Sequence, residues 1–167
     1  MAAQTHTACV ALGANIGEPL RQIEAAFAAL AALPGTRVLA RSSLYRSAPV
    51  GYADQPDFIN AVAMIETALA PHALLDALLA IERAHGRVRE FPNSPRTLDL
   101  DIVLYGDVVL QEPGLTIPHA RMLERAFVML PLAEIAPDAV VPGQGKVSDL
   151  ARLVDAASVA QLQKILV

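Results

Sequence analysis

Residues 94–106 read "SPRTLDLDIVLYG", a short run in which apolar residues alternate with two aspartates. Successive side chains of a β-strand point to opposite faces, so residues i and i+2 share a face. The alternation therefore predicts a strand over Leu98–Tyr105, with Asp99 and Asp101 together on one face. The opposite face is expected to enter the core, and it carries Leu98, Leu100, Ile102 and Leu104.

The chain before this strand supplies a repeating pattern of strands and helices. We predict strands over residues 7–13, 37–46 and 58–67, and helices between Pro19 and Pro34 and between Pro71 and Gly86. The order β-α-β-β-α-β is typical of the ferredoxin-like α+β fold, in which one antiparallel sheet carries both helices on one face. Extra strands and helices are expected after residue 106, and residues 147–166 carry an amphipathic helical pattern.

Length and composition indicate one soluble domain over residues 1–167. Hydrophobic residues make up 54% of the chain, but no apolar run approaches the roughly 18 residues of a membrane-spanning helix. The N-terminus lacks the pattern of a secretory signal. Cys9 is the only cysteine, so no intrachain disulfide can form, and we expect it to pack in a strand. A cytoplasmic location is therefore expected.

The charge and the aromatic content exclude a common class of function. The net charge is −4, which argues against binding of nucleic acid through the overall field of the protein. RNA-recognition domains of ferredoxin-like shape place aromatic side chains on central strands within a basic surface. Only 4% of the residues are aromatic and the sequence pI is about 5.5, so we expect no nucleic-acid partner.

The paired aspartates indicate a cation site. Two carboxylates about 6 Å apart repel by roughly 3 kcal/mol at an effective dielectric constant near 20, so a positive charge should lie between them. Mg²⁺ is commonly held by one or two carboxylates together with substrate phosphates. For the pair taken alone, the alternative is a solvated strand face with arginine partners, and that is the better interpretation of a bare D-x-D motif.

A cluster of arginines precedes the strand and favours an anionic ligand. Arg83, Arg87, Arg89 and Arg96 fall within fourteen residues, and residues 86–97 are too polar and proline-rich for regular structure. Guanidinium groups bind phosphate through two parallel hydrogen bonds. Because the chain lacks the G-x-x-x-x-G-K-[ST] phosphate loop, metal and arginines would carry the phosphate charge. A solvated basic loop is the alternative.

Several longer stretches are similar to one enzyme family. "PRTLDLDIVLYG" and "LTIPHARMLERAFVMLPLAEIAP" resemble 6-hydroxymethyl-7,8-dihydropterin pyrophosphokinase of folate biosynthesis, and "ALGANIG" and "SSLYRSAPVGYADQPDFINAV" match it as well. The resemblance runs from about Val10 to Pro137. It implies a pyrophosphokinase that transfers the terminal pyrophosphate of ATP to the hydroxymethyl oxygen of the pterin and releases AMP.

The resemblance also implies roles for individual residues. Asp99 and Asp101 would bind two Mg²⁺ ions that bridge the ATP phosphates, and Asp101 would be a candidate to remove the hydroxyl proton. Arg87 and then Arg96 are the candidates to stabilise charge on the transferred group. The residues around ATP would be Glu82, Arg87, Arg89, Arg96, Ile102, Thr116, His119 and Arg125. The residues around the pterin would be Ser47, Val50, Phe58, Asn60 and Phe127.

Two other functions remain open at this point. A ferredoxin-like ligand-binding or regulatory module without catalysis would share the fold, and an ordinary kinase that moves only the γ-phosphate would use similar metals and arginines. Without the resemblance, Phe58 and Phe127 are most simply core residues, Asn60 a turn or edge group, and His119 a structural histidine. ATP and the pterin are the expected partners of a monomer.

Overall fold

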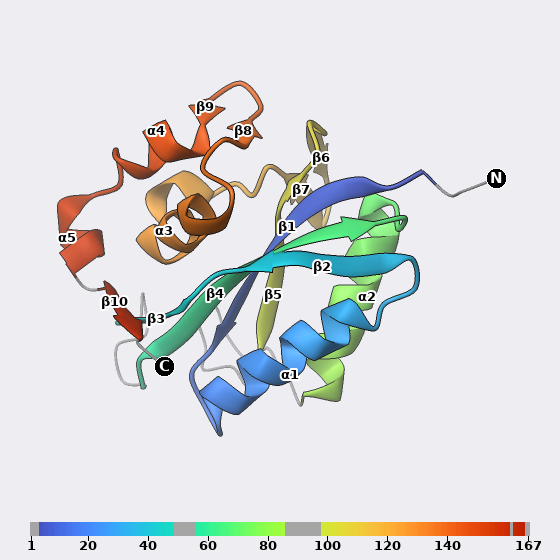
Figure 1. The fold of residues 1–167 in the computed structure, drawn as a ribbon, viewed down its shortest axis with the longest axis horizontal. Helices are drawn as coiled ribbons and strands as arrows, with labels where there is room; N and C mark the ends of the chain where they lie inside the picture. The colour runs from blue at the N-terminus through green and yellow to red at the C-terminus, as the bar shows by residue number, and fades with distance from the viewer. Residues whose placement is uncertain (1–3, 49–55, 86–97, 161, 166–167) are drawn as a thin grey trace.

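The computed structural model describes residues 4–48, 56–85, 98–160 and 162–165. Its central unit runs β1 (His6–Ala14), α1 (Pro19–Ala31), β2 (Thr36–Arg41), β3 (Leu44–Ser47), β4 (Phe58–Thr67), α2 (Pro71–Ala84) and β5 (Asp99–Tyr105) (Figure 1). With β10 (Leu162–Ile165) added near the C-terminus, the strands pair antiparallel in the order β10-β3-β4-β1-β5, and β2 also pairs with β4. The predicted ferredoxin-like fold is confirmed.

The strand predicted over residues 37–46 is in fact two strands, β2 and β3, which both pair with β4. The break lies at Ser42. Its backbone N–H donates to the Val62 carbonyl at 2.9 Å, and its hydroxyl accepts the Val62 N–H at 2.9 Å. The Ser42 hydroxyl oxygen thus takes the place of a main-chain carbonyl as the acceptor for the Val62 N–H. This backbone group therefore keeps a hydrogen bond where β2 ends and β3 has not yet begun.

The sheet is buried on both faces. Helices α1 and α2 cover one face, and α3 (Ala126–Ile135) covers the other, with α4 (Val147–Ala151) packed against α3 (Figure 1). The chain reaches α3 through β6 (Leu110–Glu112), β7 (Leu115–Ile117) and the 3₁₀ turn η1 (Met122–Glu124). Cys9 packs in β1 on the α3 face, and burial raises the pKa of its thiol to about 12.

A bulge in β5 changes which residues face the helices. Leu98, Leu100 and Ile102 pack on the α1 and α2 side as predicted, but Leu104 lies on the α3 side together with Val103. The pairing of β1 with β5 shifts by one residue between Cys9 and Val10, which leaves Val103 as the extra residue. Because an extra residue reverses the alternation beyond it, the placement predicted for Leu104 is wrong.

The C-terminal segment is not the continuous amphipathic helix that the pattern of residues 147–166 suggests. After the small hairpin of β8 (Val140–Val141) and β9 (Gly145–Lys146), two five-residue helices follow, α4 and α5 (Ala156–Ala160). The chain then returns to the sheet as β10 (Leu162–Ile165), which pairs with β3. In the described ranges no helix is long and apolar enough to cross a membrane.

Glu134 connects α3 with β3 and β10. Its carboxylate accepts hydrogen bonds from the backbone N–H of Ser43 and from the Tyr45 hydroxyl, the latter at 3.0 Å. It also forms an ion pair with the Lys164 ammonium group at 3.2 Å. Burial alone would raise the pKa of this carboxyl, but the hydrogen bonds from Ser43, Lys164 and Tyr45 outweigh it and lower the pKa below 4.5. The charged form is therefore favoured in the folded protein.

We predict that Glu134→Gln lowers the free energy of unfolding by about 1–2 kcal/mol at pH 7, because the donors lose a charged acceptor. A lowered folded-state pKa means that this stabilisation is present above pH 4.5 and is lost as the pH falls through the folded value. Urea unfolding at several pH values should show the difference shrinking below pH 4.5. A difference that is constant with pH would contradict the prediction.

The matched control is Asp138→Asn. Asp138 is a surface acid with a side chain 88% exposed, and its ion pair with Lys146 spans 3.4 Å. Exposed pairs of this kind contribute roughly 0–1 kcal/mol. Its substitution should therefore change the stability less than Glu134→Gln does at pH 7.

Candidate active site

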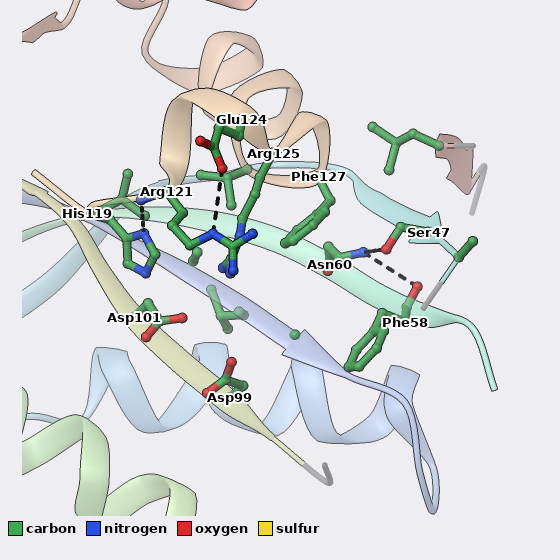
Figure 2. A pocket seen from close by; sticks show the side chains of 17 residues that line it. Ser47, Phe58, Asn60, Asp99, Asp101, His119, Arg121, Glu124, Arg125 and Phe127 are labelled. Atoms are coloured by element: carbon green, nitrogen blue, oxygen red, sulfur yellow. Dashed lines mark hydrogen bonds and ion pairs between the residues drawn. The ribbon is translucent and has the colours of Figure 1, made fainter. Parts of the chain in front are cut away.

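A pocket of about 290 Å³ lies on the α3 face of the sheet (Figure 2). Strands β1, β4 and β5 form its floor, and residues 119–128 form its opposite wall. Eight of the residues expected from the family resemblance line it: Ser47, Phe58, Asn60, Asp99, Asp101, His119, Arg125 and Phe127. Residues far apart in the sequence thus meet in one concave site, as enzyme sites commonly require.

The register of the sheet fixes the floor of this pocket. Gly13 pairs with Asn60 on one side and with Asp99 on the other, and Ala11 pairs in the same way with Val62 and Asp101. Cross-strand partners share a face, so the small residues Gly13 and Ala11 lie between the side chains of β4 and the two aspartates of β5. Gly13 lies within β1, in line with the strand predicted over residues 7–13, and the turn after β1 falls at Gly17, whose φ is 72°.

Asp99 and Asp101 both project from β5 toward the pocket (Figure 2). Each is partly buried, whereas Leu98 and Leu100 on the opposite face are 0% and 2% exposed. The described residues contain no group of three or more acidic, histidine or cysteine side chains that could enclose a metal ion. A carboxylate pair open to a pocket suits a hard cation that takes its remaining ligands from a substrate.

Positive groups face the two aspartates across the pocket. Arg121 and Arg125 both line it, and Arg125 is also the N-cap residue of α3. The N-terminus of that ten-residue helix therefore points its partial positive charge toward the same space. Arg121 pairs with Glu124 at 3.6 Å, and both side chains are more than half exposed. This end of the pocket can hold an anion.

His119 is neutral near pH 7 and has a defined orientation. Burial lowers the pKa of His119 below 6.5, the charge of Arg125 and that of Arg121 lower it further, and Asp99 acts in the opposite direction. Its Nδ1 accepts the backbone N–H of Arg121 at 3.2 Å (Figure 2). The proton of the neutral ring is therefore assigned to Nε2, which can donate a hydrogen bond.

The far end of the pocket combines an amide with two aromatic rings. Asn60 is 4% exposed, and its Nδ2 donates to the Ser47 hydroxyl at 2.7 Å and to the carbonyls of Tyr45 and Phe58 at 3.4 and 3.5 Å. Two main-chain acceptors fix the amide orientation, because only an NH₂ group can serve them. Phe58 from β4 and Phe127 from α3 lie close to this amide (Figure 2).

The amide oxygen of Asn60 faces the floor. Its Oδ1 lies 3.5 Å from the position that a Cβ atom on Gly13 would take. Because Gly13 has no side chain, the space beside this oxygen is kept for a ligand. The pocket thus offers a fixed acceptor between aromatic faces, which is an arrangement suited to a flat heterocycle with N–H donors.

Three residues expected near ATP do not line this pocket. Glu82 is 2% exposed and its Oε2 accepts the Leu100 N–H at 2.8 Å, while Ile102 faces the helices because alternation places it opposite the aspartates. Thr116 is exposed on β7. Four other expected residues lie outside the described residues: Val50, Arg87, Arg89 and Arg96.

Sequence reasoning missed some residues of the pocket. Val103 continues the alternation that begins at Asp99, so this periodicity was a usable signal for it. Arg121 lies between His119 and Arg125, and only their shared loop could have indicated it. Leu162 lines the pocket from β10, and no local pattern predicts that this segment returns to the sheet.

Comparison with known proteins identifies the family. The model of the family 7,8-dihydro-6-hydroxymethylpterin-pyrophosphokinase matches residues 9–137. A 2-amino-4-hydroxy-6-hydroxymethyldihydropteridine pyrophosphokinase of Pseudomonas aeruginosa is 56% identical over 133 residues, which are 80% of this chain and 82% of the relative. The enzyme of the same name from Haemophilus influenzae is 49% identical over 146 residues, covering 87% and 91%.

Solved structures agree on the fold. A crystal structure of Plasmodium falciparum HPPK-DHPS with pterin and p-hydroxybenzoate superposes with a TM-score of 0.75 at 14% identity. The match covers 98% of this chain and 46% of the Plasmodium chain, so this chain spans about half of that protein. With the pocket and the sequence matches taken together, the chain belongs to the 7,8-dihydro-6-hydroxymethylpterin-pyrophosphokinase family.

Proposed function

We propose that this chain uses the pocket on the α3 face to transfer pyrophosphate from ATP to the hydroxymethyl group of 6-hydroxymethyl-7,8-dihydropterin. The products are AMP and the pterin diphosphate, in a step of folate biosynthesis. Family membership supports the reaction. The observation that supports the assignment of the site is the meeting of a carboxylate pair, arginines and an amide with two aromatic rings in one pocket.

The end of the pocket around β5 is proposed to hold the nucleotide. Asp99 and Asp101 would bind Mg²⁺, and we propose two ions because the pair can share two cations with the ATP phosphates. Such ions neutralise the phosphate charge and orient the reacting oxygens. Arg125 and the Nε2–H of His119 face the same space and can bind phosphate oxygens, and Asp101 is the candidate acceptor for the hydroxyl proton.

Residues outside the described ranges complete this proposal on the basis of the family resemblance alone. Arg87 and Arg96 are proposed to stabilise negative charge on the transferred group, because phosphoryl transfer depends on positioning and charge neutralisation. Arg89 is proposed to contact ATP, and Val50 to contact the pterin. Glu82 is proposed to act through the strand that it supports, since its carboxylate binds the Leu100 N–H.

The opposite end is proposed to hold the pterin. Phe58 and Phe127 can stack on a flat bicyclic ring, and the fixed amide oxygen of Asn60 can accept hydrogen bonds from its N–H groups. The Ser47 hydroxyl accepts from Asn60 and keeps a proton of its own to donate. Such a site selects a ring with donors and acceptors along its edge, because a ligand without them would leave buried polar groups unmatched.

The other functions considered from the sequence are less well supported. A regulatory module without catalysis is not favoured, because the family and its curated relatives are named as pyrophosphokinases. An ordinary kinase would release ADP instead of AMP, so the product discriminates between the two reactions. A single domain over residues 1–167, a monomer and a cytoplasmic location stay predictions.

The product of the reaction tests the proposal. We predict that the protein, incubated with ATP, Mg²⁺ and 6-hydroxymethyl-7,8-dihydropterin, forms AMP in a one-to-one ratio with the pterin diphosphate, as measured by chromatography of both products. ADP as the product would indicate transfer of the γ-phosphate. The absence of turnover would favour a binding module.

Asp99→Asn and Asp101→Asn provide the site control for this assay. Each should lower the turnover by about a thousandfold, because a cation binding site loses its charge while the volume of the side chain is kept. Asp107→Asn is the matched variant, since Asp107 is exposed just beyond the end of β5. Near-normal turnover in either pocket variant would exclude the metal assignment.

We also predict that His119 contributes through its Nε2–H. His119→Ala should raise the KM for ATP about tenfold, because a hydrogen bond to a charged oxygen is lost. His119→Gln places an amide N–H near the position of Nε2 and should keep the KM within about threefold of the original value. Steady-state kinetics with varied ATP will measure both values. Equal effects of the two substitutions would contradict the assigned proton position.

A further inference from the structure

Strand β10 lies outside the residues that the family model matches, which end at residue 137, yet it reaches the pocket. It pairs antiparallel with β3, with Leu162 opposite Ser47 and Ile165 opposite Leu44. The pairing covers an edge of β3 that would otherwise expose unpaired backbone groups. Figure 1 shows β10 beside β3 at the edge of the sheet.

The two faces of β10 contact different parts of the protein. Leu162 packs against the apolar cluster of the α3 face, and Lys164 forms its ion pair with Glu134 of α3 on that same side. Ile165 packs against the cluster of the α1 and α2 face, and Gln163 is exposed. Alternate side chains of β10 thus contact opposite sides of the sheet, as in a regular strand. This pattern places Leu162 on the same face as the pocket.

The register of the sheet places Leu162 at the end of the pocket that holds the amide and the aromatic rings. Leu162 pairs with Ser47, and Ser47 pairs in turn with Phe58, so the three side chains share one row and one face. All three line the pocket. The Ser47 hydroxyl is also the closest acceptor of the Asn60 amide, at 2.7 Å.

We propose that β10 forms one wall of the pterin subsite and that Leu162 is a substrate-contact residue that determines how tightly the pterin ring is held. This inference rests on the proposed function, which assigns this end of the pocket to the pterin. An apolar side chain there removes water from the edge of the ring and strengthens the hydrogen bonds to Asn60 and Ser47. Its effect should be limited to the pterin, because Asp99 and Asp101 line the pocket from β5, at the opposite edge of the sheet from β10.

The test is a comparison of Leu162→Ala with Gln163→Ala in the full chain. Binding of 6-hydroxymethyl-7,8-dihydropterin is measured by calorimetry with Mg²⁺ and the non-hydrolysable analogue α,β-methylene-ATP at saturation, and binding of the analogue is measured separately. Leu162→Ala should weaken pterin binding about fivefold, as expected for loss of part of a leucine contact. The affinity for the analogue should stay within about twofold of that of the unaltered chain, because Leu162 lies far from the aspartates at the nucleotide end of the pocket.

Gln163→Ala alters an exposed residue of the same strand, on the face opposite to Leu162, and should change neither affinity. Leu162→Met keeps the apolar volume of the side chain and should keep the pterin affinity of the unaltered chain. This variant distinguishes loss of a wall contact from a general loss of structure. Equal pterin affinities of Leu162→Ala and the unaltered chain, or equal losses for pterin and nucleotide, would overturn the inference. Failure of the unaltered chain to bind the pterin would instead overturn the proposed function, and this inference with it.

Discussion

The division of β5 into an apolar face and an acidic face is the constraint on which the rest of the site depends. Leu98, Leu100 and Ile102 are buried against α1 and α2, so Asp99 and Asp101 cannot turn inward without exposing them. Strand β5 lies at the edge of the sheet, and the Glu82 carboxylate accepts the Leu100 N–H between the two aspartates at 2.8 Å. Hydrophobic burial thereby holds a charged pair in a fixed direction.

The same sheet also separates the two ends of the pocket. Gly13 and Ala11 on β1 lie between the aspartates of β5 and their partners Asn60 and Val62 on β4. Because both residues are small, the middle of the pocket floor leaves space for a ligand. Charged groups gather at the end near β5 and α3, while Asn60, the phenyl rings and Leu162 gather near β3 and β10. A polyphosphate at the charged end and a flat heterocycle at the other end fit this separation.

The sequence allowed the central unit and the direction of Asp99 and Asp101 to be predicted, because both follow from local periodicity. It did not reveal the break at Ser42 or the bulge at Val103, since each depends on a hydrogen bond or register with another strand. Phe58, Asn60 and Phe127 could be named only through family resemblance, because their own patterns fit core or turn residues equally well. Neither the local pattern nor the family resemblance indicated Leu162, because its position in the pocket depends on the pairing of β10 with β3.

The most direct measurement of the role of β5 is a crystal structure of the protein with Mn²⁺ in place of Mg²⁺ and with α,β-methylene-ATP, with data collected at the manganese absorption edge. If the aspartate pair anchors the metal and nucleotide, anomalous density will lie against the carboxylates of Asp99 and Asp101 and against the phosphates. Nucleotide bound in the pocket with no anomalous density at either aspartate would contradict this role.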